Sequence, residues 1–507
     1  CMTVGRPRSA PATAVEARGF SGMVQRFSTT TRSDQASAAA RSSGSGGDPA
    51  WIPSPSTRVR GRSSAQPGWT SPATQSTSNP IPESASAQLR ATTETPSVGP
   101  NRKERIVQRG VLVDGNGLPD PSYRDLRAAV GRLLGDHRVP EGYAAPNSRV
   151  YPWQWLWDSC FHVLVWQELD EGGRAQRELE AVFGPQAPSG FVPHINYVRD
   201  PGFHEDLWGR RDGSSITQPP MYGHAVAELV RAGSPPPDRV VEAAVAGLRF
   251  LLDQRARDRS GLLLVCHPWE TGSDDSPRWD DACPGGYDRK RWAVVKDHLV
   301  STIQVGPDGS PVANPDFPVA SVGFNALVAF NAGELAAVVG DERLAAGATE
   351  LAEALTGRWS DEIGTWVDAG PMAGGSGRVR TLDSLLPLLV DDDPGRAAIV
   401  LGQLTDPAAH GGPAGPTGVH RGEPSFHPDA YWRGPVWPQL AYLMVLAADR
   451  HSPEVAADLS RTTVAGAWAS GLAEYWNPDS GAGLGAVPQS WTGLALLLAA
   501  RRDAATA

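Results

Sequence analysis

The sequence is poor in cysteine and in lysine. Its four cysteines are Cys1, Cys160, Cys266 and Cys283, and neither Cys-x-x-Cys pairs nor the Cys/His spacing of a zinc site occurs among them. This excludes a disulfide framework and favours reduced thiols in a cytoplasmic protein. Only three lysines accompany 43 arginines, a bias typical of a GC-rich bacterial genome. No run of 18 apolar residues is present, which argues against a membrane-spanning helix.

The charge is unevenly distributed along the chain. Residues 1–100 carry ten arginines and five acidic residues, whereas the remainder carries 36 basic against 51 acidic side chains, a formal net charge of −15. Nucleic acids and anionic membranes bind basic surfaces, so we expect neither as a partner. The histidines lack HExxH-type spacing, and the Gly/Ser clusters lack the strand-turn-helix context of a phosphate-binding loop. We therefore expect no metal and no cofactor.

Residues 1–100 also differ from the rest in composition. Fifty-five of them are Ser, Thr, Pro, Gly or Gln, and Leu89 is the only leucine. Such a segment buries too little apolar surface to offset the entropy of ordering it, and it lacks the apolar core of a secretory signal. We expect a disordered low-complexity segment over 1–100 and one folded domain over 101–507.

From about Ser122 the apolar residues recur at helical spacing almost to the end of the chain. About twelve segments carry this pattern: 122–135, 157–169, 174–183, 221–232, 238–256, 321–339, 342–357, 380–389, 395–404, 432–449, 453–470 and 489–502. Residues 324–339 and 437–448 are apolar on nearly all sides, as buried helices are. Buried segments alternating with amphipathic ones predict an all-α fold with an inner and an outer ring, an (α/α)6 barrel of six hairpins.

The links between these helices contain most of the tryptophans. Residues 267–280 read His-Pro-Trp-Glu-Thr-Gly-Ser-Asp-Asp-Ser-Pro-Arg-Trp-Asp, with four carboxylates around a helix-breaking glycine and proline. Neither a helical nor a strand period sorts the apolar residues of this segment onto one face. Indole faces stack on sugar rings, while carboxylates bond hydroxyls and transfer protons, so the composition is typical of a carbohydrate site. An acidic turn pinned by core tryptophans is the alternative for this segment taken alone.

Four motifs in these links carry a resemblance to a known family. They are Trp155-Leu-Trp-Asp158, the segment 267–279, Tyr431-Trp-Arg-Gly-Pro-Val-Trp437, and Glu474-Tyr-Trp-Asn-Pro followed by Gly-Leu-Gly485. In this order they resemble family 63 glycoside hydrolases, and within that family the bacterial mannosylglycerate and glucosylglycerate hydrolases. The resemblance covers about residues 105–502. It implies an (α/α)6 barrel with irregular substrate-binding loops that hydrolyses an α-glycosidic bond with inversion, without metal or organic cofactor.

The resemblance implies Asp274 as the general acid and Glu474 as the general base. Asp275 is the local alternative for the acid, and a solvated acid before a helix is the alternative for Glu474. A general acid must stay protonated near neutral pH, which a neighbouring negative charge on Glu270 or Asp275 and tryptophan-lined desolvation would favour. Inverting pairs stand about 6.5–9.5 Å apart so that a water molecule fits between them.

The same resemblance implies a set of substrate-binding residues. They are Tyr151, Trp155, Asp158, Gln218, Trp269, Gly272, Tyr431, Trp432, Trp437 and Gln489. Each has an ordinary alternative: Asp158 could cap the helix that begins beside it, any single tryptophan could be core, and the glutamines could be surface or capping residues. Arg433 fits a site carboxylate or a helix cap equally well.

The sequence thus predicts an inverting α-glycoside hydrolase acting on a small carbohydrate of the glucosyl- or mannosylglycerate type. An α-glucosidase on oligosaccharides or a trehalase-like hydrolase is the alternative enzyme, although the trehalase signature Gln-Trp-Asp-x-Pro-x-Gly-Trp is missing. A catalytically inactive sugar-binding barrel is the alternative from another class. A glycerate carboxylate would need a cation, for which Tyr287, Arg289 and Arg291 are the nearest candidates. The oligomeric state and the glycoside itself stay open.

Overall fold

A computed structural model describes residues 112–113 and 117–506, so the segment expected to be disordered lies outside the described residues. The described part is mostly helical, as predicted. Its strands are two or three residues long and pair only into two-stranded antiparallel sheets.

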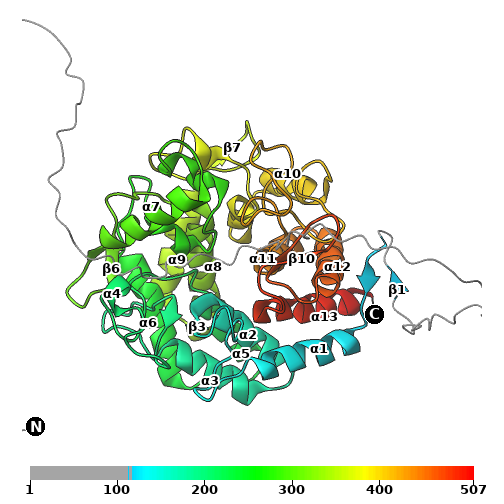
Figure 1. Cartoon of the computed structure of the whole chain (residues 1–507), viewed down its shortest axis with the longest axis horizontal. Helices are drawn as coiled ribbons and strands as arrows, with labels where there is room; N and C mark the ends of the chain where they lie inside the picture. Colours follow the sequence, from blue (N-terminus) through cyan, green and yellow to red (C-terminus); the bar gives the residue numbers. More distant parts are fainter. Residues whose placement is uncertain (1–111, 114–116, 507) are drawn as a thin grey trace, which may run out of the picture. The chain divides into compact units, whose positions relative to one another are not determined.

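Six elements form an inner circle in which each contacts the next and the last returns to the first. In chain order they are α2 (Leu156–Glu168), α5 (Tyr222–Arg231), α8 (Val322–Val339), the 3-10 segment η4 (Leu382–Leu389), α11 (Pro438–Asp449) and the 3-10 segment η5 (Ser490–Leu494). The labels α2, α5, α8 and α11 lie around the centre of the view in Figure 1.

Each inner element is covered by an outer helix. The outer helices are α1 (Tyr123–Asp136) on η5, α3 (Gly172–Val182) on α2, α6 (Asp238–Gln254) on α5, α9 (Glu342–Thr356) on α8, α10 (Pro394–Thr405) on η4 and α12 (Pro453–Ala469) on α11. The final helix, α13 (Ala495–Thr506), continues directly from η5 and packs on α12 and α1. Outer and inner elements therefore alternate along the chain.

The inner helices α2, α8 and α11 are apolar on nearly all sides because both of their faces are covered. α8 is the clearest case: by length and composition it is the one helix among the described residues that could cross a membrane, yet 67% of it is buried inside the fold. Its polar side chains are satisfied within the protein. Asn325 exchanges hydrogen bonds with the backbone N–H and C=O of Leu263, and Asn331 accepts one from the N–H of His224. α8 is a core helix.

The outer helices bury one stripe each. In α1 the buried residues Leu126, Val130, Leu133 and Leu134 recur every three to four positions, and the Ser122 hydroxyl caps the helix by accepting from the N–H of Asp125. Each fully buried leucine contributes roughly 2 kcal/mol. This one-sided burial fixes the outer helices against the inner circle.

Two of the predicted helical segments differ clearly in the structure. Residues 382–389 form the 3-10 segment η4 rather than an α-helix, because Pro387 lies inside it and cannot donate a helical hydrogen bond. The helix predicted from residue 432 begins only at Pro438, after an irregular stretch. The sequence analysis also missed two helices, α4 (Glu205–Trp208) and α7 (Arg289–Ser301). In α7 only Trp292, Leu299 and Val300 are buried, so no apolar stripe marked it.

Short sheets and 3-10 turns fix the loops between the helices. The sheets pair β1 (Leu112–Val113) with β2 (Pro119–Asp120), β3 (Gln154–Trp155) with β4 (Ile195–Asn196), β5 (Gln304–Val305) with β6 (Pro311–Ala313), β7 (Trp359–Ser360) with β8 (Thr365–Trp366), and β9 (Tyr475–Trp476) with β10 (Gly483–Leu484). The remaining 3-10 turns are η1 (Pro268–Thr271), η2 (Pro277–Ala282) and η3 (Ser376–Arg378). The β3–β4 and β9–β10 pairs hold the loops that lead into α2 and η5.

Candidate active site

A cavity of about 520 Å³ opens where the inner elements begin. It is lined by eleven of the twelve predicted site residues: Tyr151, Trp155, Asp158, Gln218, Trp269, Gly272, Asp274, Tyr431, Trp432, Glu474 and Gln489. These residues come from loops that precede α2, α5, α11 and η5 and from the segment between α6 and α7. Residues more than 300 positions apart in sequence therefore meet in one place.

Trp437 is the predicted site residue that does not line the cavity. It is fully buried and stacks on Trp432, with ring centroids 3.7 Å apart, and on Tyr475 at 4.5 Å. Because Trp437 immediately precedes α11, its side chain is directed into the core. It supports the aromatic wall from behind.

Asp274 lies between the turns η1 and η2 with one side open to the cavity. Its backbone oxygen accepts a hydrogen bond from Trp292 Nε1 at 3.0 Å, and its Oδ2 accepts from the Tyr431 hydroxyl at 3.2 Å. Burial raises the pKa of Asp274 to about 7, and the charges of Asp275 and Glu474 act in the same direction against the lowering effect of Lys296. A carboxyl group of this kind keeps a proton near neutral pH.

Glu474 lies directly before β9 and is 3% exposed. Its Oε2 accepts from the N–H of Ala486 at 2.8 Å and its Oε1 from the Tyr151 hydroxyl at 3.0 Å. Burial raises the pKa of Glu474 to about 7, while both hydrogen bonds favour its charged form. Glu474 also acts as one of the charges that raise the pKa of Asp274. Both carboxyl groups are therefore able to exchange a proton near neutral pH.

Of the two acids proposed to supply a charge beside Asp274, Asp275 fits and Glu270 does not. Glu270 is fully buried and accepts two hydrogen bonds from Arg255, at 2.6 and 2.9 Å, and others from the N–H groups of Cys266 and Thr217. The charge of Glu270 is therefore neutralised by Arg255. Asp275 forms an ion pair with Lys296 Nζ at 2.6 Å and lies next to Asp274 in the chain.

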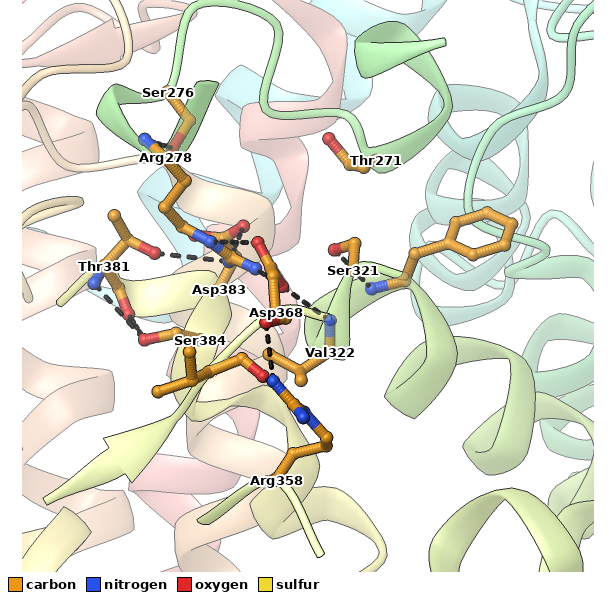
Figure 2. A network of polar contacts seen from close by, with 12 residues as sticks. Thr271, Ser276, Arg278, Ser321, Val322, Arg358, Asp368, Thr381, Asp383 and Ser384 are labelled. Atoms are coloured by element: carbon orange, nitrogen blue, oxygen red, sulfur yellow. Dashed lines mark hydrogen bonds and ion pairs between the residues drawn. The ribbon is translucent and has the colours of Figure 1, made fainter. Parts of the chain in front are cut away.

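A buried polar network holds the Asp274 loop on α8 and η4 (Figure 2). Arg278 is fully buried, bonds both carboxylate oxygens of Asp368, and binds Asp383 Oδ2 at 2.8 Å. Asp368 accepts from the N–H of Val322 at the start of α8, and Asp383 accepts from the Ser273 hydroxyl. Since Ser273 precedes Asp274, the network fixes the candidate acid to the inner circle.

Two positions in the cavity wall have unusual backbone conformations. Gly272 has φ +75°, and a Cβ atom there would lie 2.4 Å from the Trp157 ring, so this position requires glycine. Trp432 has φ 58°, which is strained for a residue with a side chain and is common at functional sites.

Two buried polar atoms of the cavity wall have no hydrogen-bond partner within the part of the chain that the structure describes. They are Trp432 Nε1 and Gln489 Oε1. Buried polar atoms are normally satisfied, so these two are suited to the hydroxyl groups of a bound ligand.

The structure also decides three of the alternatives left by the sequence. Asp158 is buried in the first turn of α2 but is not the N-cap, which is Trp155, and Gln218 Oε1 accepts from the N–H of Trp157 in that turn. Burial raises the pKa of Asp158 well above its usual range. Arg433 binds Asp280 and lies 3.6 Å from the Tyr287 ring, so it pairs with a carboxylate outside the cavity lining.

The cations of the cavity come from α7. Arg289 lines it as expected, together with Lys290 and Lys296, which the sequence analysis missed. Arg291 is exposed and bonds the carbonyl oxygens of Gly285 and Gly286 instead. The available signal was compositional, because two of the three lysines in the chain occur in this short segment.

A second cluster, His224, Glu228 and Glu334, is close enough to share an ion but lies outside the cavity lining. Arg231 forms ion pairs with both glutamates.

The chain is similar to known glycoside hydrolases in sequence and in fold. Residues 151–492 match the mannosylglycerate hydrolase MGH1-like glycoside hydrolase domain. The chain is 30% identical over 400 residues to a mannosylglycerate hydrolase of Thermus thermophilus, covering 69% of this chain and 94% of that protein. It is 27% identical over 456 residues to a glucosylglycerate hydrolase of Mycolicibacterium hassiacum, covering 75% and 98%. The crystal structure of the family 63 mannosylglycerate hydrolase from Thermus thermophilus with Tris and D-glycerate superposes with a TM-score of 0.63 at 27% identity, over 73% of this chain and 99% of that one.

Proposed function

Because the chain belongs to the mannosylglycerate hydrolase MGH1-like glycoside hydrolase family, we propose that this glycoside hydrolase cleaves a glucosyl- or mannosylglycerate with inversion at the anomeric carbon. The observation that carries the proposal is the pair of carboxyl groups, the partly exposed Asp274 and the buried Glu474, on separate loops of one tryptophan-lined cavity. The pKa of each is raised to about 7.

The proposed scaffold is an (α/α)6 barrel. Its support is the alternation of six outer and six inner elements and the closed circle of contacts among the inner ones. In such a barrel the cavity lies at the end where the inner elements begin, so the loops before them supply the site.

In the proposed mechanism Asp274 donates its proton to the glycosidic oxygen as the bond to the aglycone breaks. Glu474 accepts a proton from a water molecule that attacks the anomeric carbon from the opposite face. Tyr151 donates a hydrogen bond to Glu474 and so fixes the orientation of the base. One displacement at the anomeric carbon releases the sugar with inverted configuration.

The other cavity residues are assigned to substrate binding. Trp155, Trp269 and Trp432 provide faces for the sugar ring. The unsatisfied Trp432 Nε1 and Gln489 Oε1, and the buried Asp158, provide polar partners for its hydroxyl groups. The walls exclude bulk water, which strengthens each of these contacts.

The charge of α7 supports an anionic aglycone. Arg289, Lys290 and Lys296 place cations along one side of the cavity, and Lys296 lies beside the loop of the candidate acid. A leaving group must depart on the side of the acid, so a glycerate carboxylate would meet these cations. A neutral aglycone would leave them without an anionic partner in the substrate.

A substrate panel tests the proposal. The purified protein would be assayed with glucosylglycerate, mannosylglycerate, the uncharged glucosylglycerol, trehalose and short α-glucans, with released sugar measured. We expect kcat/KM for a glycerate glycoside to exceed that for glucosylglycerol at least tenfold, about 1.4 kcal/mol for the charged contact. Faster cleavage of trehalose or α-glucans would favour the oligosaccharide alternative. Sugar binding by calorimetry without any hydrolysis would favour the inactive barrel.

A further inference from the structure

The helix α7 lies outside the alternation of inner and outer elements and packs against the loop that carries Asp274. Arg289, Ala293 and Lys296 recur every three to four positions and all line the cavity. This face has no apolar stripe to hold it in place. Trp292 and Leu299 anchor the helix in the hydrophobic core, and polar contacts join it to the loop that carries Asp274.

Three such contacts join α7 to the loop. Trp292 Nε1 donates to the backbone oxygen of Asp274 at 3.0 Å. Lys296 Nζ binds Asp275 Oδ1 at 2.6 Å. His267 Nδ1 accepts from the N–H of Trp269, so its Nε2 carries the proton and donates to the backbone oxygen of Lys296 at 3.0 Å. The helix therefore contacts both the start of the loop and the acid itself.

The Lys296 side chain is confined. Its ammonium group lies 5.5 Å from the Trp269 ring centroid and 6.0 Å from that of Trp292. The Lys296 side chain is 12% exposed and that of Asp275 is 4% exposed. Water is largely excluded from the pair, so its charges act on their neighbours with little screening. The Tyr287 hydroxyl donates to the other oxygen of Asp275 at 3.1 Å, which fixes the carboxylate in place.

We propose that Lys296 is a positioning residue for the general acid, acting on Asp274 through its ion pair with Asp275 and through the attachment of α7 to the acid loop. The proposal rests on the proposed function, in which Asp274 is the proton donor. It assigns to α7 a role in catalysis in addition to any contact with the aglycone.

The two charges of the pair act on Asp274 in opposite directions. The groups that face Asp274 are Asp275 from its own loop, Lys296 from α7, Tyr431 from the loop before α11 and Glu474 from the segment before β9. Asp275 and Glu474 raise the pKa of Asp274, whereas Lys296 and the Tyr431 hydroxyl lower it. The pKa of Glu474 is raised by its burial, and the hydrogen bonds from Ala486 and Tyr151 lower it.

This asymmetry gives a signature in the pH profile. Activity requires Asp274 protonated and Glu474 ionised, so the basic limb reports Asp274 and the acidic limb reports Glu474. Lys296→Met should move the basic limb of kcat/KM to higher pH, and Asp275→Asn should move it to lower pH, each by about 0.5–1 pH unit. The double variant should lie between the two. The acidic limb should stay in place in all three.

Matched variants separate this effect from general damage to the fold. Arg291→Met removes a cation from α7 outside the cavity lining and should leave both limbs unchanged. Lys290→Met removes a cavity cation whose side chain, within the described residues, forms no hydrogen bond or ion pair with the acid loop. This variant should raise KM without moving the basic limb. Lys296→Arg keeps the positive charge, so its basic limb should lie closer to that of the parent than the basic limb of Lys296→Met does. The position of a limb does not depend on how much of a sample is folded, and the melting temperature of each variant would be measured beside it.

A second measurement does not depend on turnover. The carboxylic acid band of Asp274, identified by its loss in Asp274→Asn, can be titrated by infrared difference spectroscopy in the intact protein. Opposite shifts for Lys296→Met and Asp275→Asn would support the proposal even if the protein cleaved no glycerate glycoside, which would refute only the proposed function. Shifts in the same direction, or a basic limb and a band that stay within 0.2 pH unit of the parent, would overturn the role of Lys296.

Discussion

Replacing Asp274 with asparagine should remove most of the activity and at the same time stabilise the fold. The pKa of the Asp274 carboxyl group is raised from 3.8 to about 7, so its charged form is less favourable in the folded protein than in the unfolded chain. Each pKa unit corresponds to about 1.4 kcal/mol, which gives a penalty of about 4 kcal/mol for the ionised group. Since one side of Asp274 faces the cavity, solvent screening reduces this to an expected gain of about 2 kcal/mol for Asp274→Asn.

The gain should depend on pH in a defined way. Below about pH 4 the carboxyl is protonated in both states and the variant gains nothing. As the pH rises to about 7 the unfolded chain loses its proton first, so the folded parent loses stability relative to the variant. Above pH 7 the difference is complete and stays constant. The asparagine oxygen can still accept the hydrogen bond from the Tyr431 hydroxyl, so the local structure is retained.

The activity should change in the opposite direction. A positioned general acid contributes about 10²–10⁴ to the rate, so kcat for a glycerate glycoside should fall by that factor. The loss should be smaller for a glycosyl fluoride, whose leaving group needs little protonation. Asp275→Asn is the matched control and should keep far more of the activity, because it lies beside the donor and is not the donor.

Denaturant titrations at pH 4, 6 and 8, read together with kcat, check this reasoning. If Asp274→Asn is both inactive and less stable than the parent at pH 8, Asp274 stabilises the fold, and the reasoning that its carboxylate lowers the stability of the folded protein is wrong. An Asp274→Asn variant with near-normal kcat, combined with an inactive Asp275→Asn, would exchange the roles of the two residues.

Three further predictions concern the base, the stereochemistry and the loop. Glu474→Gln should lower kcat by about 10²–10⁴ with a smaller gain in stability at pH 8, because the amide oxygen can accept only one of the two hydrogen bonds that Ala486 and Tyr151 donate to the carboxylate. A gain larger than that of Asp274→Asn would contradict this. NMR of the first product should show the β-anomer of the sugar, whereas an α-anomer would indicate a retaining enzyme and refute Glu474 as the base. Arg278→Met should destabilise the fold by about 3–5 kcal/mol, because it leaves Asp368 and Asp383 as uncompensated buried charges. An unchanged denaturation midpoint would show that other contacts hold the loop of Asp274 in place.

The helical fold class and most of the residues that line the cavity could be predicted from the sequence, because both depend on residues that are close together along the chain. Helical periodicity depends only on neighbours along the chain, and it revealed the buried α8 as clearly as the one-sided α1. The irregular links were recognisable because tryptophan and aspartate are concentrated where no core would place them. Periodicity failed at η4, where Pro387 interrupts the helical hydrogen bonds, and at α7, whose few buried apolar residues stand among charged ones.

Only the tertiary structure decided what each polar residue does, because that depends on partners far away in the sequence. Glu270 and Asp275 are five positions apart in one loop, yet Arg255 neutralises the first and Lys296 from α7 pairs with the second. Trp432 and Trp437 are equally plausible as stacking surfaces from the sequence, but the start of α11 directs Trp437 into the core. The raised pKa values of Asp274 and Glu474 have the same origin. Burial and neighbouring charge are properties of the assembled cavity, and no spacing along the chain contains them.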